Sequence, residues 1–414
     1  MGAYLVSNSL AQEKEKGTFD FIRMTTIDRK ILALGKLVGA PLFLTFLLTI
    51  TFPLVSIFAW LGEIPFTHFF MIHLNLIIYG LFFQIIGLFS AVVISKITSA
   101  NSMALSIPVL ITGISLALET RTGNPFYQLF SILGKNPLEI HKIGFWGFMI
   151  TDFLILWGII LYFSGWLMVG IIRKLDSDSS HPLNKKQAVI LMIGIEIIMM
   201  GFLWNSFISE KNGLGVSLIF YVINLLLSLI LINIVGPNQD DVVIYLNNPE
   251  SHWYKKIWNS HSQLTSGFIW IVSGIVFSFS IILIAVSWLK YSFNQELIFI
   301  NLSFAIIFTL FTFIYAKMFY LGNLTLGKNA TAFTSLFIFL SLFIPIPLNY
   351  LTFPDSQFVD LLMLNPIVAF VHFSNIEYWG ISGVIQLVLI LALALVLNLF
   401  TQKREEILNQ RYRI

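Results

Sequence analysis

Long runs of apolar residues are the feature that most restricts how this chain can fold. Runs that meet the length of about 20 residues needed to cross a bilayer recur along it. They lie at 37–61, 69–95, 103–119, 147–172, 188–206, 215–235, 268–289, 296–316, 329–349 and 377–400. Because lipid offers no hydrogen-bond partner to an open sheet edge, all ten segments are predicted to be helices. The expected fold class is an all-α polytopic membrane protein.

Composition and charge support this prediction and suggest an orientation. Charged residues make up 11% of the chain, against about 25% in soluble domains. If the N-terminus is cytosolic and the spans alternate, nineteen of the 24 lysines and arginines fall inside and five outside. By the positive-inside rule, both termini are expected in the cytosol. The sequence contains no cysteine, which excludes disulfides, thiolate catalysis and cysteine metal sites.

The segment before the first long run is charged and amphipathic. Residues 9–36 read SLAQEKEKGTFDFIRMTTIDRKILALGK. Gly17 interrupts the charged run, and Thr18 can cap a short helix with the sequence TFDFIRM. Asp28 is then expected to begin the first long helix. The apolar residues of the short helix are expected on or near one side, and they are Phe19, Phe21 and Ile22.

This segment resembles a cytosolic connection in the membrane subunit of type-2 ABC exporters. That family commonly has S-x-A-x-E-x-E-x-G-T, an apolar stretch, Thr-Pro and a closing Gly-Lys. The matching positions are Ser9, Ala11, Glu13, Glu15, Gly17, Thr18, Thr25, Gly35 and Lys36. Thr26 stands where the family commonly has proline. The resemblance implies that region 9–30 is a coupling helix, and the alternative is an ordinary charged anchor beside the membrane.

The resemblance also implies a function and partners. The chain would be the permease subunit of an exporter that moves an unidentified substrate outward, without enzymatic activity of its own. This chain lacks the G-x-x-x-x-G-K-[ST] loop, so it is expected to bind no cofactor. ATP would be bound by a separate ABC ATPase, which the resemblance implies in two copies. Other expected partners are the lipid bilayer and a second copy or a related permease, and nucleic acid is not expected. The implied location is a bacterial plasma (inner) membrane. The coupling residues would be Glu13, Glu15, Gly17, Thr18, Phe19, Phe21 and Ile22.

Two parts of the chain resemble each other, which predicts a tandem repeat. Segment 79–118 is similar to 308–348, and an Asn-Pro and a Trp-Gly pair follow each in the same order. The pairs are Asn136-Pro137 with Trp146-Gly147, and Asn365-Pro366 with Trp379-Gly380.

The predicted repeat divides the chain into two unequal membrane units. The first unit is expected over 1–174, with the coupling segment and four spans, and it lacks the first two spans of the family's unit. Residues 175–187 are expected to form a cytosolic linker. The second unit is expected over 188–414, with six spans. In it, residues 237–267 occupy the coupling position without the coupling pattern, so their role stays open.

Polar residues within the apolar runs are candidates for a translocation path. They are Glu196, Asn75, Gln84, Asn224 and Asn301. Glu196 lies near the middle of its run, where a charge is costly, so it is expected to face other helices or a cavity. The alternative for each amide is an ordinary interhelical hydrogen bond. Two other functions remain open from sequence, a membrane-embedded lipid-modifying enzyme and a non-transporting scaffold.

Overall fold

The structure is a computed structural model in which part of the chain is described. The described residues are 1–94, 96–117, 142–177, 181–208, 213–236, 266–291, 295–326, 388, 391–392, 395–401 and 403. Several predicted features lie outside these residues. They are the span 329–349, most of 377–400, nearly all of 237–267, both Asn-Pro pairs and the second Trp-Gly pair.

The chain divides into two compact units. One contains Met1–Gly144 and Phe148–Leu183, and the other contains Phe145–Gly147 and Asn184–Ile414. The division after Leu183 falls within the segment that the sequence suggested as a linker.

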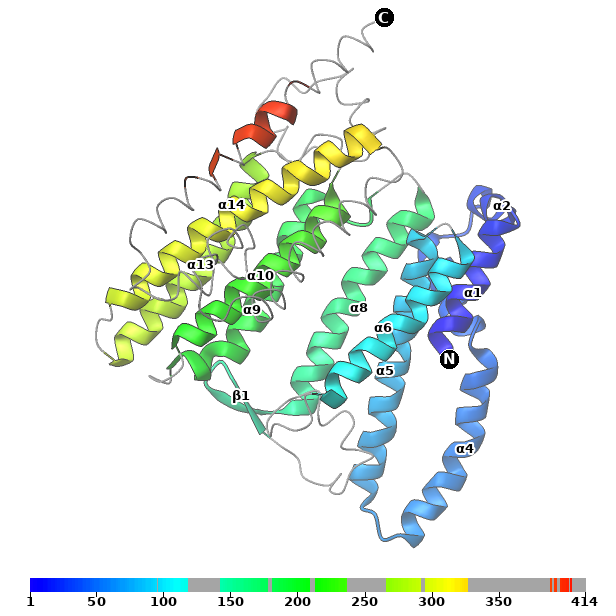
Figure 1. Cartoon of the computed structure of the whole chain (residues 1–414). Helices are drawn as coiled ribbons and strands as arrows, with labels where there is room; N and C mark the ends of the chain where they lie inside the picture. The colour runs from blue at the N-terminus through cyan, green and yellow to red at the C-terminus, as the bar shows by residue number, and fades with distance from the viewer. Residues whose placement is uncertain are drawn as a thin grey trace, which may run out of the picture. The chain divides into compact units, whose positions relative to one another are not determined.

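The first unit is organised around one long helix, α5 (Phe66–Val93) (Figure 1). Helix α5 packs against α1 (Gly2–Glu15), α6 (Ile97–Ala117) and α8 (Asp152–Asp176). Between α1 and α5 the chain forms α2 (Thr18–Met24), α3 (Arg29–Gly39) and α4 (Leu42–Leu61).

The contact between α1 and α5 forms the tightest described part of the first unit. Gly87 of α5 lies so close to the backbone of Ala3 that a side chain there would overlap it. One turn further, the hydroxyl of Ser90 lies 3.5 Å from that of Ser7. The buried side chains of Val6, Leu10 and Leu88 belong to the core built on this contact.

The first long apolar run is two helices rather than one. The sequence predicts a span over 37–61, whereas α3 ends at Gly39 and α4 begins at Leu42, with Pro41 between them. Proline removes a backbone donor, which explains the break. The expected helix start at Asp28 is confirmed, because its carboxylate accepts a hydrogen bond of 2.9 Å from the backbone nitrogen of Lys30.

The predicted span 147–172 begins differently from the expectation. Residues Lys142–Phe145 (β1) and Phe148–Thr151 (β2) form a two-stranded hairpin, and the helix starts only at Asp152. The turn residues Trp146 and Gly147 have φ of 53° and 80°. Positive φ at both central positions is typical of a type I′ two-residue hairpin turn, so Trp146-Gly147 is a turn and not the start of a span.

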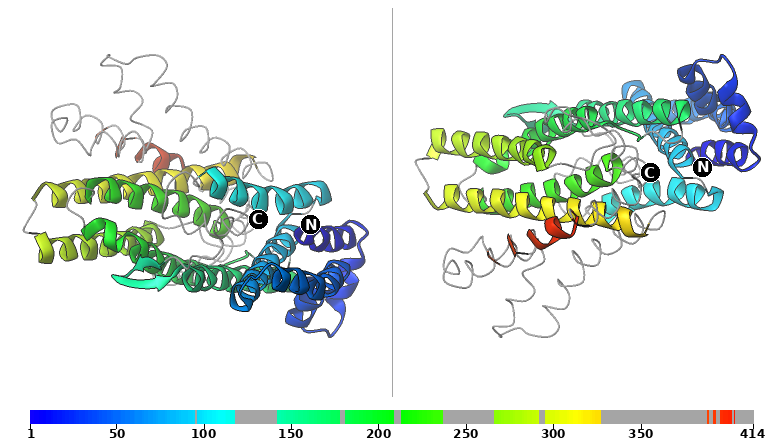
Figure 2. Two further views of the ribbon diagram at one scale, coloured as in Figure 1. Left: turned by 90° about the horizontal axis from the view of Figure 1, so that it is seen from below. Right: turned by 90° about the horizontal axis from the view of Figure 1, so that it is seen from above.

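The described residues of the second unit form four long helices that run side by side (Figures 1 and 2). They are α9 (Lys185–Ile208), α10 (Gly213–Val235), α13 (Ser266–Tyr291) and α14 (Gln295–Leu326). Helix α9 starts earlier than predicted because Asn184 and Gln187 exchange two backbone-to-side-chain hydrogen bonds of 3.0 and 2.8 Å. This reciprocal pair satisfies two of the donors that a helix start leaves unpaired. In the core, the ring of Tyr221 lies 5.6 Å from that of Phe304.

The described helices are those of a membrane-embedded protein. Five of them are long and apolar enough to cross a bilayer. These spans are Leu42–Leu61, Phe69–Val93, Leu154–Asp176, Lys185–Trp204 and Asn301–Leu321. Four hydroxyl groups of α4, a helix with a largely exposed surface, donate to carbonyl groups of α4 itself, so that surface suits lipid. They belong to Thr45, Thr49, Thr51 and Ser56.

A matched pair of glycine substitutions in α5 tests the close α1–α5 contact. Gly87→Ala is expected to lower stability by about 1–3 kcal/mol, because the added methyl group overlaps the backbone of α1. Gly80→Ala is the control, since no heavy atom lies within 4 Å of a Cβ at that position. The control is expected to be neutral or slightly stabilising. Thermal unfolding of both variants in detergent measures the difference, and equal unfolding midpoints would contradict the packing.

Candidate functional site

The segment from Glu13 to Lys36 forms a compact structure around the short helix α2. Its bounds, Thr18–Met24, are those of the predicted TFDFIRM helix. Gly17, with φ of 70°, turns the chain between α1 and α2 and is the residue that caps α2. This left-handed conformation favours glycine. The hydroxyl of Thr18 donates instead to the carbonyl oxygen of Glu13, at 3.2 Å, so the expected cap by Thr18 is wrong.

The two phenylalanines of α2 lie in opposite environments. Phe19 is 3% exposed and belongs to the core of the first unit, whereas Phe21 is 70% exposed. Two cations approach the ring of Phe19, with Lys14 Nζ at 5.8 Å and Arg23 Cζ at 4.9 Å from its centroid. Met24 is also exposed. The expectation that Phe19 and Phe21 share a side therefore needs correction, because one anchors α2 and the other lies on its surface.

The segment is fastened to the C-terminal ends of two long helices. Lys14 Nζ donates to the carbonyl oxygen of Val92, at 2.7 Å, in the last turn of α5. Arg23 donates to the carbonyl oxygens of Leu175, at 3.1 Å, and Lys174, at 2.7 Å, in the last turn of α8. The last carbonyl groups of a helix have no partner within it, and they favour a nearby cation. The two basic residues therefore cap α5 and α8.

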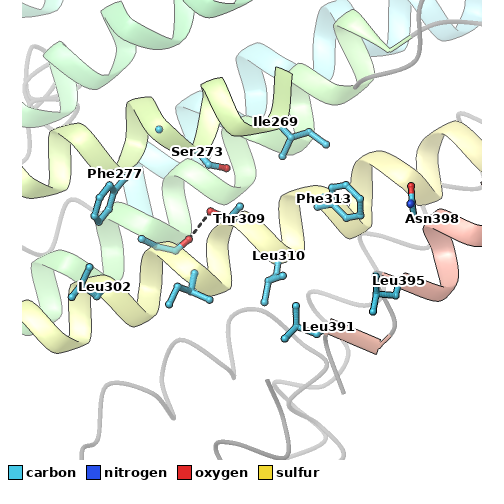
Figure 3. Close-up of a pocket in the computed structure, with 13 residues that line it drawn as sticks. Ile269, Ser273, Phe277, Leu302, Thr309, Leu310, Phe313, Leu391, Leu395 and Asn398 are labelled. Atoms are coloured by element: carbon cyan, nitrogen blue, oxygen red, sulfur yellow. Dashed lines mark hydrogen bonds between the residues drawn. The ribbon is translucent and has the colours of Figure 1, made fainter. Parts of the chain in front are cut away.

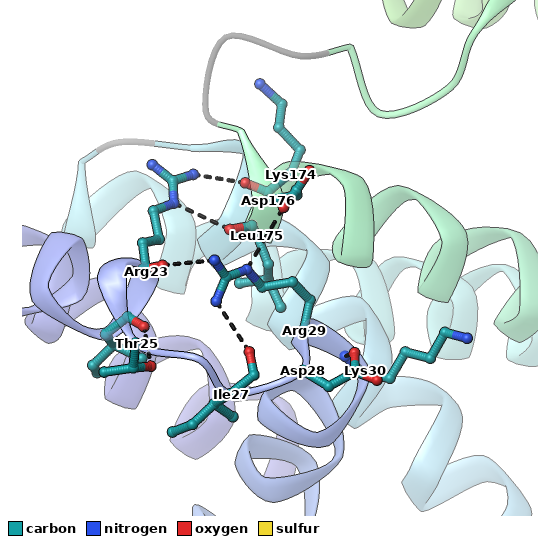
Figure 4. Close-up of polar contacts among 10 residues, drawn as sticks. Arg23, Thr25, Ile27, Asp28, Arg29, Lys30, Lys174, Leu175 and Asp176 are labelled. Carbon is teal, nitrogen blue, oxygen red and sulfur yellow. Dashed lines mark hydrogen bonds and ion pairs between the residues drawn. The ribbon is translucent and has the colours of Figure 1, made fainter.

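A second arginine closes this arrangement, which Figure 4 shows. Arg29 donates to the carbonyl oxygens of Arg23, at 2.6 Å, and Ile27, at 3.2 Å, and its Nε lies 3.7 Å from a carboxylate oxygen of Asp176. The turn between α2 and α3 is thus held against the end of α8 as well.

The two predicted coupling glutamates have different roles. Glu13 accepts a hydrogen bond and forms an ion pair with Lys36 of α3, so it closes the segment internally. Glu15 is exposed and forms no ion pair with the described residues. Ile22 is partly buried. Of the predicted coupling residues, those that are exposed are Glu15, Gly17, Thr18 and Phe21.

The predicted path residues divide between the two units. In the first unit, Asn75 accepts a hydrogen bond of 2.6 Å from the indole of Trp157, and Gln84 lies against Gly2. This hydrogen bond joins α8 to α5, so Asn75 fits the alternative expected from sequence, an ordinary interhelical hydrogen bond. In the second unit, Glu196 and Asn224 are fully buried and lie beside each other.

Asn301, the remaining predicted path residue, is also buried in the second unit, at 2% exposed. Its backbone carbonyl accepts a hydrogen bond of 3.2 Å from the hydroxyl of Tyr221. Burial of Glu196, at 0% exposed, confirms that it faces other helices rather than lipid.

The second unit also contains an apolar pocket of about 660 Å³. It lies between α13, α14 and the helical residues near the C-terminus, as Figure 3 shows. Phe277, Leu310 and Leu395 are typical of its lining, and Ser273 and Asn398 are among its few polar residues. Its described lining carries no charged side chain, which suits an apolar ligand such as a lipid chain. Within the described part of the chain, no three His, Asp or Glu side chains gather as a metal site.

Sequence reasoning missed Lys14, Arg23 and Arg29 as the residues that fasten the segment. Their residue types were visible, but the partners that fasten them to α5 and α8 lie far along the chain, and no local pattern indicates them. The chain matches no family model, no curated protein and no solved structure.

Substitution of Arg23 tests how α2 is fastened. Arg23→Ala removes two charge-assisted hydrogen bonds to α8, and we expect a local loss of about 1–3 kcal/mol. Hydrogen exchange of the α2 and α8-end amides should then become faster. Arg23→Lys should give an intermediate effect, because an ammonium group cannot reproduce the fork of the guanidinium group. Lys30→Ala, at an exposed position in the same segment, is the control, and equal exchange in all variants would contradict the arrangement.

Proposed function

We propose that this chain is the permease subunit of an ATP-driven exporter of the type-2 ABC class. The observation that carries the proposal is the two-sided character of α2. Phe21 and Met24 are 70% and 78% exposed, whereas Phe19 and Arg23 on the other side hold the helix to the first unit. The exposed side of α2 thus carries two large apolar side chains beside the exposed carboxylate of Asp20. A short helix that is fixed on one side and offers such a surface on the other is suited to contact a separate protein.

The residues that fasten α2 to α5 and α8 would transmit a displacement of α2 to these membrane helices. Closure of an ATPase dimer would press on Phe21, and α2 would move with its anchor Phe19. Lys14 and Arg23 would then carry the displacement to the ends of α5 and α8, because both donate to carbonyl groups there. ATP binding would in this way favour one of two helix arrangements, inward-facing or outward-facing.

The internal contacts of the two units support the proposed tandem repeat. In the first unit, Ser7 of α1 lies against Ser90 of α5. In the second unit, Gly236, directly after α10, lies close to Phe319 of α14. A Cβ atom at position 236 would overlap the phenylalanine ring. The same sequence offset separates Ser7 from Gly236 and Ser90 from Phe319, and it also relates the two similar segments of the sequence.

The paired helices also run in the same direction in both units. Ala3 and then Ser7 of α1 meet Gly87 and then Ser90 of α5. Along α10, Tyr221 and then Ser228 meet Asn301 and then Thr312 of α14, with the last pair 3.5 Å apart. Two unequal copies with ten spans and cytosolic termini, in a plasma membrane, remain part of the proposal.

Photo-crosslinking from α2 tests the proposed partner. A photoreactive amino acid at Phe21 or Met24, in membranes of the native host, is expected to crosslink to a protein with an ATP-binding G-x-x-x-x-G-K-[ST] loop. The same group at Phe58 of α4, which is 71% exposed, is the control and should not crosslink to that protein. Mass spectrometry identifies the product. An active transport complex without an ATPase crosslink at either α2 position would contradict the proposal and favour a scaffold.

The proposed orientation can be tested by labelling single cysteines in a chain that has none of its own. A cysteine at Asp20 in α2 should react with a membrane-impermeant maleimide only after cells are permeabilised. A cysteine at Glu63, between α4 and α5, should react in intact cells, because one span separates the two sites. The reverse pattern would place α2 outside and exclude contact with a cytosolic ATPase.

A further inference from the structure

The second unit buries a carboxyl group in the interior of its helices. Glu196 of α9 is 0% exposed. Neither of its carboxyl oxygens has a hydrogen-bond partner among the described residues. The side-chain amide of Asn224 in α10 lies beside the carboxyl group. Its nitrogen already donates to the carbonyl oxygen of Phe220, at 3.2 Å, and its oxygen is buried without a partner in the described structure.

The described helices that pack against α9 provide no fixed counter-charge at this depth. Helix α9 contacts α10 and α13. Tyr221 is the only titratable residue of α10, and α13 carries only Lys290 and Tyr291, both at its end. On α9 itself, Lys185 and Lys186 lie at the first turn, and Lys185 is roughly 16 Å from Glu196 along the axis. An ionised carboxylate here would therefore be buried without a nearby cation.

The three atoms without partners are all acceptors. The second N–H of Asn224 lies beside the carboxyl group but can serve only one of its two oxygens, so the site has more acceptors than donors. Oε1 and Oε2 of Glu196 and Oδ1 of Asn224 can each accept a hydrogen bond, and none can donate one while the carboxyl group is ionised. A single proton on Glu196 removes the charge and creates an O–H group that can donate to Asn224. A metal ion would instead need several oxygen ligands at one point. No group of three acidic or histidine side chains occurs among the described residues.

We propose that Glu196, with Asn224 beside it, is a proton-binding site within the second unit. The step is the addition of one proton to the carboxylate to give the neutral acid, whose O–H donates to the amide oxygen. Glu196 holds the proton while α9 and α10 are packed together, and it releases the proton when water reaches the carboxyl group. The packing of these two helices thereby depends on pH. This inference does not depend on an ATPase partner.

Infrared spectroscopy of the full chain in lipid nanodiscs, without any ATPase, tests the proposal. At neutral pH the wild-type chain is expected to show the C=O stretching band of a protonated carboxyl group. The band should be absent in Glu196→Gln and retained in Glu63→Gln, a control at the α4–α5 turn. Raising the pH should remove the band and lower the thermal unfolding midpoint of the wild type. The midpoint of Glu196→Gln should change less, because its amide cannot release a proton.

A second variant keeps the proposal testable if Glu196→Gln does not fold. Asn224→Leu keeps the carboxyl group and removes its acceptor, so the band should persist and move to higher frequency. A neutral-pH band that is unchanged in Glu196→Gln would overturn the proposal. A rise in the wild-type unfolding midpoint with sodium or potassium chloride, absent in Glu196→Gln, would also overturn it, since the site would then bind a metal cation.

Discussion

Hydrogen bonds from basic side chains to the last carbonyl groups of α5 and α8 are the interactions on which the first unit's candidate site depends. Lys14 reaches Val92, and Arg23 reaches the end of α8 at Lys174 and Leu175. Both helix ends would otherwise leave acceptors unpaired at a place where the chain leaves the apolar spans. Because the same residues flank Phe19, the short helix α2 cannot shift without disturbing both ends. These contacts fix the surface segment to the ends of both helices.

The second unit differs from the first in its buried carboxyl group. Neither oxygen of Glu196 has a partner among the described residues, whereas Glu13 of the first unit pairs one of its oxygens with Lys36. Glu196 and Asn224 are the pair on which this contrast depends. In a medium that supplies no water, an unpaired carboxyl group is tolerated only if something neutralises or hydrates it. The first unit thus uses its polar groups to fasten a surface segment, whereas the second places a group that can change its state inside the helix bundle. Such a division of roles suits a transporter whose two units differ.

Local signals made part of this structure predictable from sequence. The bounds of α2 and the start of α3 at Asp28 follow from Gly17, the aspartate cap and the apolar spacing, all of which lie within a few residues. The hairpin at Trp146-Gly147 could not be read in the same way, because a tryptophan with positive φ carries no common turn signal. The role of Arg23 was hidden for another reason, since its acceptors on α8 are backbone atoms 151 and 152 residues away.

The most direct test of this account is whether α2 and the end of α8 move as one body. Spin labels at Phe21 and Asp176, both exposed, can report their separation by pulsed electron paramagnetic resonance in a complex with the proposed ATPase. Loss of the Asp176 carboxylate should matter little, because exposed ion pairs contribute little to stability. The account predicts one narrow distance distribution that is unchanged between the nucleotide-free and ATP-bound states. A distribution that broadens or shifts on ATP binding would contradict it, because α2 would then move independently of α8.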